Sequence, residues 1–186
     1  MNEFLTIDTD LPVHLPATES IKPYRIYDLL EENDPRLFTV SEEFDFADKT
    51  KNAIELASSL VETCRKHKAL GLAAIQCGIP TRVFVSGYGD SYVAHFNPKV
   101  LTKSKDEVYN VEGCLSYPGL FLDIQRPKSI TVEYQDYQGV VRKASLDGLT
   151  ARVFQHEMDH LDGITFTKIC GPVKLHMGMK KRKKNK

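Results

Sequence analysis

The residues with the clearest chemical potential form the segment His156-Glu157-Met158-Asp159-His160. On a helix, residues four apart lie on one face about one turn apart, so two imidazoles at this spacing can bind one metal ion. The glutamate between them can take a proton from water that the metal activates. The segment therefore predicts a metal-dependent hydrolase with Glu157 as its acid–base residue.

A catalytic zinc-like site needs three protein ligands and one open position. The sixth residue after the second histidine is Phe166, and no glutamate follows Glu157, so the downstream third ligands of two groups of metalloproteases are missing. Other downstream candidates are a carboxylate, a thiol and an imidazole: Asp162, Cys170 and His176. Upstream, Cys114 lies in the segment 112–116, and a thiolate is a strong ligand. Chemistry alone ranks Cys114 first and Cys170 second.

Two helices are expected to position these groups. Between residues 45 and 66, apolar side chains recur at steps of three and four, which predicts an amphipathic helix with one buried face. Asp147 can cap a second helix from about 148 to 161, and Gly163 can end it. This second helix carries the histidines.

Strands are expected to precede that helix. Residues 71–78 are rich in small side chains and predict a loop leading into a strand, and Asp136-Tyr137-Gln138-Gly139 predicts a hairpin turn. The β-like runs are 82–86, 92–96, 130–134 and 140–146. The order favours an α+β fold, with small antiparallel or mixed sheets packed around a central helix that bears the two histidines.

The two ends of the chain are expected to be irregular. Residues 1–40 contain four prolines and little periodicity, with a short helix predicted near 27–32. At the other end, Gly171, Pro172 and Gly178 are expected to break any long helix before the basic run 180–186. The expected division is an N-terminal arm (1–26), a catalytic domain (27–170) and a short basic tail (171–186).

Composition narrows the class of protein. Of 186 residues, 41% are hydrophobic and 27% charged, as is ordinary for a globular chain. Acidic and basic side chains number 25 each, so no net charge indicates nucleic acid or membrane as a partner. No apolar run reaches the roughly 18 residues of a membrane span, and no signal peptide is visible. Four cysteines without such a signal predict reduced thiols and a cytoplasmic location.

Three segments in this order and spacing resemble the peptide deformylase family: Gly71-Leu72-Ala73-Ala74-Ile75-Gln76, Glu112-Gly113-Cys114-Leu115-Ser116 and Gln155-His156-Glu157-Met158-Asp159-His160. Asn97-Pro98 and Arg126 also stand where the family usually has them. The resemblance extends over roughly residues 27–170. It implies a compact α+β enzyme that removes the formyl group from the N-terminal methionine of new polypeptides.

The same resemblance implies site roles. Cys114, His156 and His160 are expected to bind one divalent ion, usually Fe²⁺, with Zn²⁺, Ni²⁺ or Co²⁺ as substitutes. Glu157 is expected to transfer protons. The other expected roles are oxyanion donation by the Gln76 side-chain amide and the Leu115 backbone N–H, docking of the peptide backbone at Gly71 and Gly113, and an apolar methionine pocket lined in part by Leu70 and Val153.

Some residues have plainer interpretations. Cys64 is expected in the core, Cys77 in a structural position, and the four histidines His14, His67, His95 and His176 in ordinary surface or loop positions. Glu112 and Arg126 are either an ion pair that steadies the Cys114 loop, which we favour, or a surface pair worth roughly 0–1 kcal/mol. Ala69 stands where the family usually has glycine, and we expect no positive φ there.

Two other functions compete with deformylation. One is an HExxH metalloprotease acting on internal peptide bonds, and the other is an inactive, metal-binding module associated with the ribosome. The expected partners are N-formylmethionyl nascent peptides, with no membrane. The basic run could contact ribosomal RNA through phosphate attraction or could be a solvated tail. The absence of a heptad pattern favours a monomer.

Overall fold

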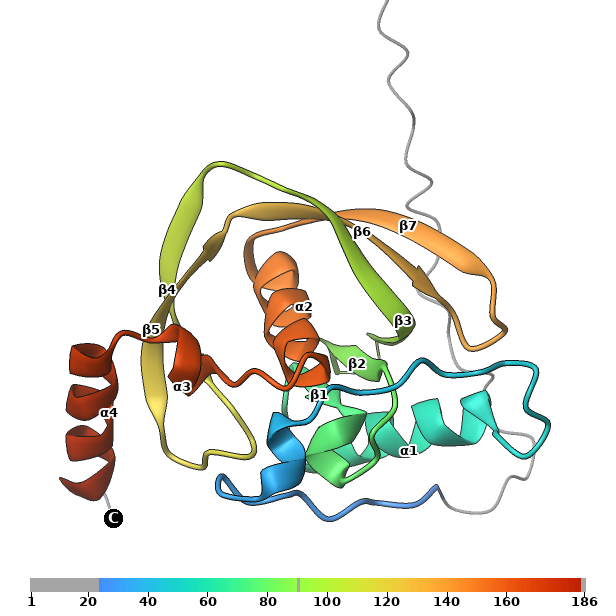
Figure 1. Ribbon diagram of the computed structural model, residues 1–186, viewed down its shortest axis with the longest axis horizontal. Coiled ribbons are helices and arrows are strands. Elements are labelled where there is room, and N and C mark those ends of the chain that lie inside the picture. Colours follow the sequence, from blue (N-terminus) through green and yellow to red (C-terminus); the bar gives the residue numbers. More distant parts are fainter. Residues whose placement is uncertain (1–23, 90, 185–186) are drawn as a thin grey trace, which may run out of the picture.

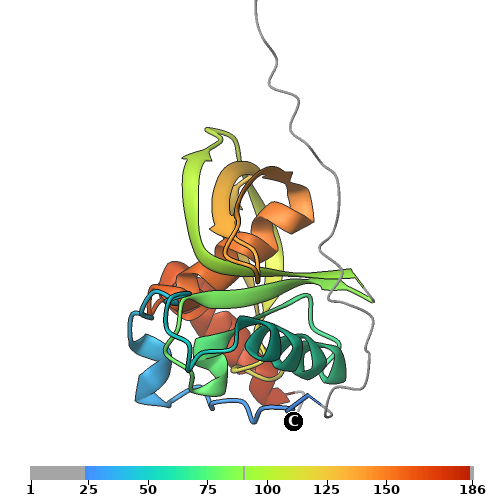
Figure 2. The same ribbon diagram turned by 90° about the vertical axis from the view of Figure 1, so that its right-hand side faces the viewer.

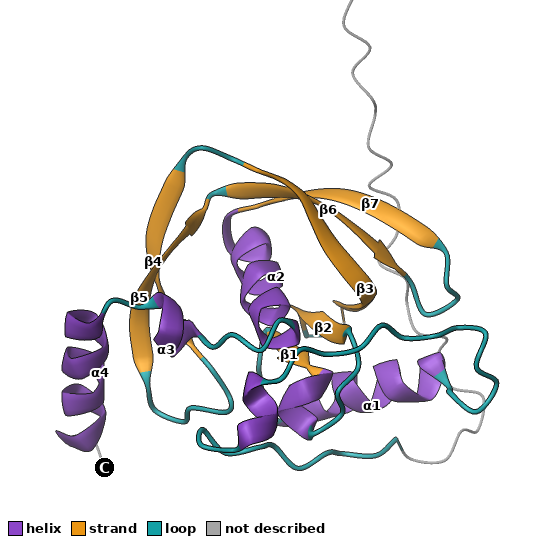
Figure 3. Cartoon of the chain, viewed as in Figure 1, coloured by secondary structure: helices purple, strands orange, loops and turns teal. Residues whose placement is uncertain are grey.

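The computed structural model describes residues 24–89 and 91–184. Figures 1 and 3 show two groups of strands around a central helix, as the sequence predicts. The helices are η1 (Pro35–Phe38), α1 (Ala53–Lys66), η2 (Ala74–Cys77), α2 (Gly148–Leu161), α3 (Phe166–Ile169) and α4 (Pro172–Lys184). The strands are β1 (Gly71–Ala73), β2 (Val83–Tyr88), β3 (Ser91–Lys103), β4 (Glu107–Gly113), β5 (Phe121–Pro127), β6 (Ser129–Gln135) and β7 (Val141–Asp147).

The strands form two antiparallel sheets. A five-stranded sheet has the order β1-β2-β3-β6-β7, and β4 pairs with β5 in a separate two-stranded sheet. The predicted hairpin is confirmed, because β6 pairs with β7 from Ser129↔Asp147 to Gln135↔Val141. The α+β fold class predicted from the sequence is thus confirmed.

The central helix is α2, and its apolar face is held in the core. Ala151, Phe154 and Leu161 are almost fully buried and pack in one cluster with Phe84 of β2 and Val132 of β6. Figure 2, at right angles to Figure 1, again shows this helix between the upper strands and the layer that contains α1. Burial of a large apolar side chain contributes about 1.5–3 kcal/mol, so this packing fixes the position of the helix.

Helix α2 begins and ends where the sequence predicts, after Asp147 and before Gly163. Asp147 occupies the N-cap position with an extended backbone, although its side chain makes no capping hydrogen bond. At the other end, Gly163 has φ +69 and its N–H donates to the carbonyl of His160 at 3.1 Å. A Cβ on Gly163 would lie 2.7 Å from the carbonyl oxygen of Phe38, so the chain can leave the helix here only as glycine.

The first helix starts later than predicted. Residues 45–50 form turns in which the side chains of Asp45 and Asp48 accept hydrogen bonds from backbone N–H groups two residues on. The helix begins at Ala53, after Asn52 accepts a hydrogen bond from the Glu55 N–H at 3.0 Å. Local side-chain bonding therefore replaces the first two turns that periodicity predicted.

The prediction of a short helix near 27–32 is wrong. This segment is irregular and enters a turn at Glu32, because its backbone bonds to other elements: the Tyr27 N–H donates to Thr63 Oγ1 at 3.0 Å, and the Leu30 N–H donates to the Gln76 carbonyl at 2.7 Å. The loop expected at 71–78 is instead strand β1 followed by η2. Residues 1–23 of the expected arm lie outside the described residues, as does His14.

The prediction that the C-terminal glycines and proline prevent a helix is also wrong. Pro172 is the first residue of α4, a position where its fixed φ suits a helix. Gly178 lies against β5: a Cβ there would be 2.5 Å from Leu122 Cδ2. The glycine therefore serves close packing of α4 beside β5, which is visible in Figure 1.

The structure corrects one histidine and supports the other plain interpretations. His95 is not a surface residue: it is buried in β3 between the rings of Phe84, Phe154 and Tyr134. The predictions for Cys64, His67, His176 and Ala69 hold, with Cys64 in the core, His67 and His176 exposed, and no positive φ at Ala69. Among the described residues, no helix is long and apolar enough to cross a membrane.

Candidate metal centre and active site

Three potential metal ligands converge from two elements. Cys114 follows the last residue of β4, and His156 and His160 lie on successive turns of α2. One ligand atom from each residue lies within 4.8 Å of the other two, and Cys114 Sγ is 3.3 Å from His160 Nε2. The upstream cysteine that chemistry ranked first is thus the one that meets the two histidines, whereas Cys170 lies elsewhere, beside α4.

The donor set fits a divalent metal ion. One thiol and two imidazoles match the ligands of catalytic zinc and related ions. Burial alone would lower the pKa of His156, but hydrogen bonds that its ring makes to Cys114 and Glu112 raise it to about 10. The surroundings of this ring therefore stabilise positive charge, and a metal ion that binds there displaces the ring proton. Burial lowers the pKa of His160 well below its usual range, which keeps that ring neutral, as a ligand must be.

Glu112 holds one of the two imidazoles in place. Its Oε2 lies 2.9 Å from His156 Nδ1, which leaves the other ring nitrogen for the metal. The same carboxylate accepts from Arg126 Nε at 2.6 Å and from Arg152 Nη1 at 2.7 Å. Burial would raise the pKa of Glu112, but these hydrogen bonds and charges lower it to about 2. The carboxylate is therefore ionised when it orients the ring.

Sequence reasoning found only part of this ion cluster. It proposed the pair of Glu112 and Arg126, whose side chains are only 4% and 6% exposed, so the surface-pair alternative does not apply. It missed Arg152 and Asp159, which complete the cluster: Arg126 Nη1 donates to Asp159 Oδ2 at 2.8 Å. The spacing of four residues from Arg152 to His156 was the available signal, because it places both on one face of α2.

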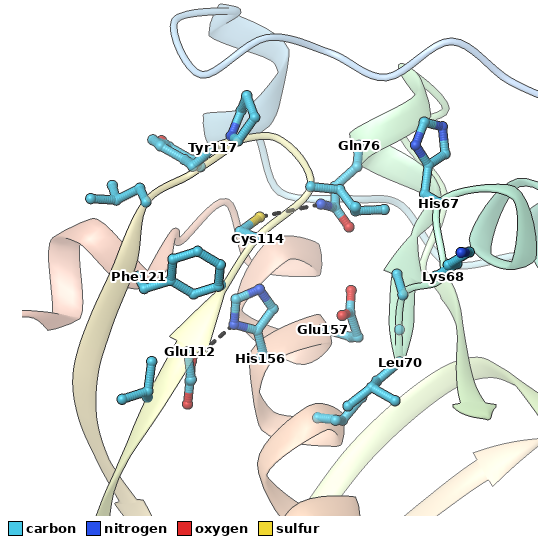
Figure 4. A pocket seen from close by; sticks show the side chains of 18 of the residues that line it. His67, Lys68, Leu70, Gln76, Glu112, Cys114, Tyr117, Phe121, His156 and Glu157 are labelled. Carbon is cyan, nitrogen blue, oxygen red and sulfur yellow. Dashed lines mark hydrogen bonds and ion pairs between the residues drawn. The ribbon is translucent and has the colours of Figure 1, made fainter. Parts of the chain in front are cut away.

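Glu157 lies in the pocket beside the ligands (Figure 4). Its Oε2 is buried and has no hydrogen-bond partner within residues 24–89 and 91–184. Burial raises the pKa of this carboxyl to about 7, although the charge of His156 opposes the shift. A carboxyl that titrates near neutral pH can both accept and donate a proton, as a general acid–base residue must.

Gly71 leaves room for that carboxylate. A Cβ at this position would lie 2.5 Å from Glu157 Oε1 and 2.9 Å from Cγ, so any side chain would displace Glu157. Gly113 closes the opposite edge, where a Cβ would lie 2.8 Å from the Phe121 ring. Both glycines line the pocket, and the close approach of backbone to functional groups accounts for their residue type.

The Gln76 side chain is aimed at the metal ligands. Its Oε1 accepts from the Ala73 N–H at 2.9 Å, which fixes the amide so that Nε2 points to the site. Nε2 lies 3.4 Å from Cys114 Sγ and 3.3 Å from Ser116 Oγ. The side chain is buried on η2. The Leu115 N–H, in the loop after β4, has no acceptor within the described part of the chain.

These groups open into one pocket of about 660 Å³. Leu70 and Val153, both predicted from the resemblance, line it, and the further apolar residues Leu149 and Phe121 extend that lining. Figure 4 shows Tyr117 and Phe121 on one side of the pocket and Leu70 on the other, with Glu157 and His156 between them. The arrangement can hold an apolar side chain next to an ion, a proton-transfer residue and amide donors.

Comparison with known proteins identifies the family. The sequence model of polypeptide deformylase matches residues 26–175. The chain belongs to the peptide deformylase family. A peptide deformylase of Erythrobacter litoralis is 36% identical over 187 residues, which cover 86% of this chain and 96% of the relative. One from Xanthomonas campestris is 40% identical over 157 residues, covering 82% and 92%.

Solved peptide deformylases share the fold. The crystal structure of the Thermotoga maritima enzyme aligns with a TM-score of 0.75 at 36% identity, over 80% of this chain and 99% of that one. A class I type b peptide deformylase from Acinetobacter baumannii, with Met-Ala-Ser bound, aligns with a TM-score of 0.73 at 27% identity, over 78% and 99%. Peptide deformylases are metal-dependent hydrolases that remove the formyl group from the N-terminal methionine of new polypeptides.

Proposed function

We propose that this pocket is where the chain deformylates N-formylmethionyl nascent peptides, with a divalent ion held by Cys114, His156 and His160. The observation that supports the proposal most strongly is the convergence of these ligand atoms within 4.8 Å beside Glu157 and the Gln76 amide. The comparisons favour this function over an endopeptidase or an inactive binding module. A binding module would also have no use for a base and an oxyanion donor.

We propose Fe²⁺ as the ion, with Zn²⁺, Ni²⁺ or Co²⁺ as substitutes. When bound, such an ion supplies Lewis acidity, which makes water a usable nucleophile near neutral pH. The Cys114 thiolate donates more charge than a carboxylate or an imidazole, which weakens that acidity. The identity of the ion should therefore affect the rate more strongly here than in a site with two histidines and a glutamate.

Glu157 takes the proton of the attacking water and delivers it to the leaving amine. Its burial and its pKa near 7 suit both steps at neutral pH. The room left by Gly71 keeps the carboxylate beside the reacting group. General acid–base catalysis of this kind contributes typically about 10²–10⁴-fold to the rate.

Attack on the formyl carbon places negative charge on the formyl oxygen. The Gln76 side-chain amide and the Leu115 backbone N–H are the two donors that stabilise it. The amide is held in advance by its bond to Ala73, so little reorganisation is needed during the reaction. Each such donor contributes about 2.7–4 kcal/mol to stabilisation of the transition state.

The methionine side chain binds between Leu70 and Val153. Both are half-buried residues of the pocket, and an unbranched thioether fits an irregular apolar site. The peptide backbone docks between Gly71 and Gly113, which lie on opposite walls and present no Cβ. The formyl group then lies beside Glu157 and the metal ligands.

The test is release of formate from formyl-Met-Ala-Ser, a substrate that corresponds to the tripeptide bound to the Acinetobacter baumannii relative. Wild type and Glu157→Ala are loaded with Fe²⁺ without oxygen, and with Ni²⁺ in parallel. Wild type should turn over, and Glu157→Ala should lose about 10²-fold or more at equal metal content. Acetyl-Met-Ala-Ser should be resistant. No formate from folded, metal-loaded wild type would contradict the proposal, and cleavage of internal peptide bonds would favour the endopeptidase.

We also propose that α4 contacts ribosomal RNA. The basic run is the end of an ordered helix, on which Lys180, Lys181, Lys183 and Lys184 are exposed. Lysines there can attract phosphates, and such binding weakens steeply with salt. Co-sedimentation with ribosomes at low salt, lost at high salt and in a variant with these lysines changed to glutamine, is expected. Binding that is unaffected by both changes would contradict this contact.

We propose further that the chain acts as a monomer in a reducing compartment such as the cytoplasm. All four cysteines are free, and Cys64 and Cys170 are buried. Burial raises the pKa of the Cys64 thiol to about 12, which keeps it unreactive. Light scattering at several concentrations tests the monomer, since a mass that doubles with concentration would contradict it.

A further inference from the structure

The end of α1 is made by a lysine in a backbone conformation that favours glycine. Lys68 has φ +53, its N–H donates to the Arg65 carbonyl at 3.0 Å, and the Ala69 N–H donates to the Cys64 carbonyl at 3.0 Å. This is the Schellman pattern, in which the left-handed residue is most often glycine. A lysine here is less favourable than glycine, so its side chain is the feature that needs an explanation.

That side chain lies at the rim of the substrate pocket. Three charged residues and one histidine that line the pocket are buried: Glu112, Arg152, Glu157 and His156. Lys68 also lines it, but is exposed, with His67 beside it. Within the described residues, the Lys68 side chain has no hydrogen-bond or ion-pair partner. Figure 4 places both residues on the side of Leu70, opposite Tyr117 and Phe121.

The backbone from Lys68 to the catalytic groups is held firmly. The Tyr92 hydroxyl donates to the Ala69 carbonyl at 2.6 Å, and the Gly87 N–H donates to the Leu70 carbonyl at 2.9 Å. The chain then enters β1, which is an edge strand of the five-stranded sheet. These hydrogen bonds fix the position of Lys68 relative to Gly71, whose backbone lies against the Glu157 carboxylate.

This geometry sets a register for a bound peptide. A substrate with its formyl group beside Glu157, extended antiparallel to β1, runs from Gly71 back toward Lys68. Gly71 and Lys68 both line the pocket and lie three residues apart, so a peptide that runs from one to the other brings its third residue to Lys68. The third residue of the substrate therefore passes the Lys68 ammonium at the rim.

We propose that Lys68 is a specificity residue that favours formyl-methionyl peptides with an acidic side chain at the third position. The inference rests on the proposed deformylase function of the same pocket. An exposed ion pair of this kind gives only a modest preference, of about two- to fivefold in kcat/KM. The preference is electrostatic, so it should shrink as salt is raised to about 0.5 M.

The test compares formyl-Met-Ala-Glu, formyl-Met-Ala-Ser and formyl-Met-Ala-Lys as substrates of the metal-loaded enzyme. Wild type should prefer the glutamate peptide, Lys68→Gly should show little preference, and Lys68→Glu should prefer the lysine peptide. Lys66→Glu is the matched control, because it changes the charge by the same amount as Lys68→Glu. Lys66 is exposed on the last turn of α1 and does not line the pocket. The Lys66→Glu variant should retain the wild-type preference.

The outcomes separate charge recognition from a structural effect. A structural role of Lys68 would change kcat/KM for all three peptides in the same direction, and that result would overturn the proposal. If Lys66→Glu and Lys68→Glu changed the peptide preference equally, the proposal would also be overturned. The preference would then come from the overall charge of this surface and not from contact with Lys68. Turnover of all three peptides at one rate by wild type would refute the preference while leaving deformylation intact. The absence of any formate would instead count against the function itself.

Discussion

The Oε2 atom of Glu112 lies 2.9 Å from Nδ1 of His156, and both side chains are buried. The same carboxylate balances two buried guanidinium groups, those of Arg126 and Arg152. One carboxylate therefore has two separate effects: it orients a metal ligand, and it compensates charge inside the fold.

Replacing Glu112 by glutamine should weaken both effects. Loss of the partner of a metal-bound histidine typically lowers metal affinity about 10–100-fold. Leaving buried charge uncompensated costs about 3–5 kcal/mol of folding stability. Competition with a chelator measures the first, and urea unfolding the second. Glu133→Gln, which breaks a partly exposed pair with Lys143, should change neither by much; similar losses there would show that the effect is not local.

Adding a methyl group at Gly71 should disable catalysis without unfolding the chain. The new Cβ would lie 2.5 Å from Glu157 Oε1, so the carboxylate must move. A displacement of about 1 Å in a reacting group can cost 10²-fold in rate. Gly71→Ala should therefore lose about 10²-fold in kcat with metal content unchanged. Gly171→Ala, where a Cβ meets nothing within 4 Å, is the control. Full activity in Gly71→Ala would contradict the assigned position of Glu157.

Removal of the Gln76 side-chain amide should lower kcat strongly and should change metal affinity much less. Gln76→Leu deletes the donor that stabilises the developing oxyanion, for which a loss of about 10²–10³-fold in kcat is expected. It also leaves the buried Ala73 N–H without its acceptor, which costs about 1–3 kcal/mol of stability. Steady-state kinetics measures the loss in kcat, and metal analysis shows whether the metal content is unchanged. Gln138→Leu in the exposed hairpin turn is the control. A change in KM with unchanged kcat would contradict the oxyanion role.

His95 should make the fold sensitive to mild acid. Burial lowers its pKa from 6.5 to about 3, and its Nδ1 has no partner within the described residues. Between pH 6.5 and 3, His95 therefore binds a proton more readily in the unfolded chain than in the folded one. The stability that comes from keeping His95 neutral is fully present above pH 6.5 and is lost as the pH falls below that value.

Between pH 7.5 and 5.5, wild type should lose about 1.4 kcal/mol more unfolding free energy than His95→Gln. Urea titrations of the two proteins at both pH values measure the difference, and the contributions of the other histidines cancel in it. Equal losses in the two proteins would show that His95 takes up its proton without unfolding.

The parts of the fold that could be predicted depend on local signals. The helix Gly148–Leu161 is predicted correctly because Asp147 and Gly163 mark its two ends. Strands β4 and β5 went unpredicted. The side chains of Val108, Tyr109 and Val111 on β4 remain exposed, and the two strands are joined by a loop rather than a tight turn.

Other errors came from tertiary contacts that outweigh local rules. Glycine has a low helix propensity, so Gly178 predicts the end of a helix, yet it is the residue that lets α4 approach Leu122. His95 looked like a polar surface residue, because nothing nearby in the sequence reveals the rings of Phe154 and Tyr134. Cys114 could be ranked by its ligand chemistry, but its distance from His160 required the fold.

The two sheets share no strand pairing, and α2 joins them: Arg152 donates to the carbonyls of Val108 and Ile124, and Gln155 donates to that of Pro127. The β4–β5 sheet can therefore open as a cooperative unit of its own, below the free energy of global unfolding. A metal ion that joins Cys114 to α2 ties this unit to the rest of the molecule. Metal loss should thus first appear as faster amide exchange in residues 107–127, while the five-stranded sheet stays protected.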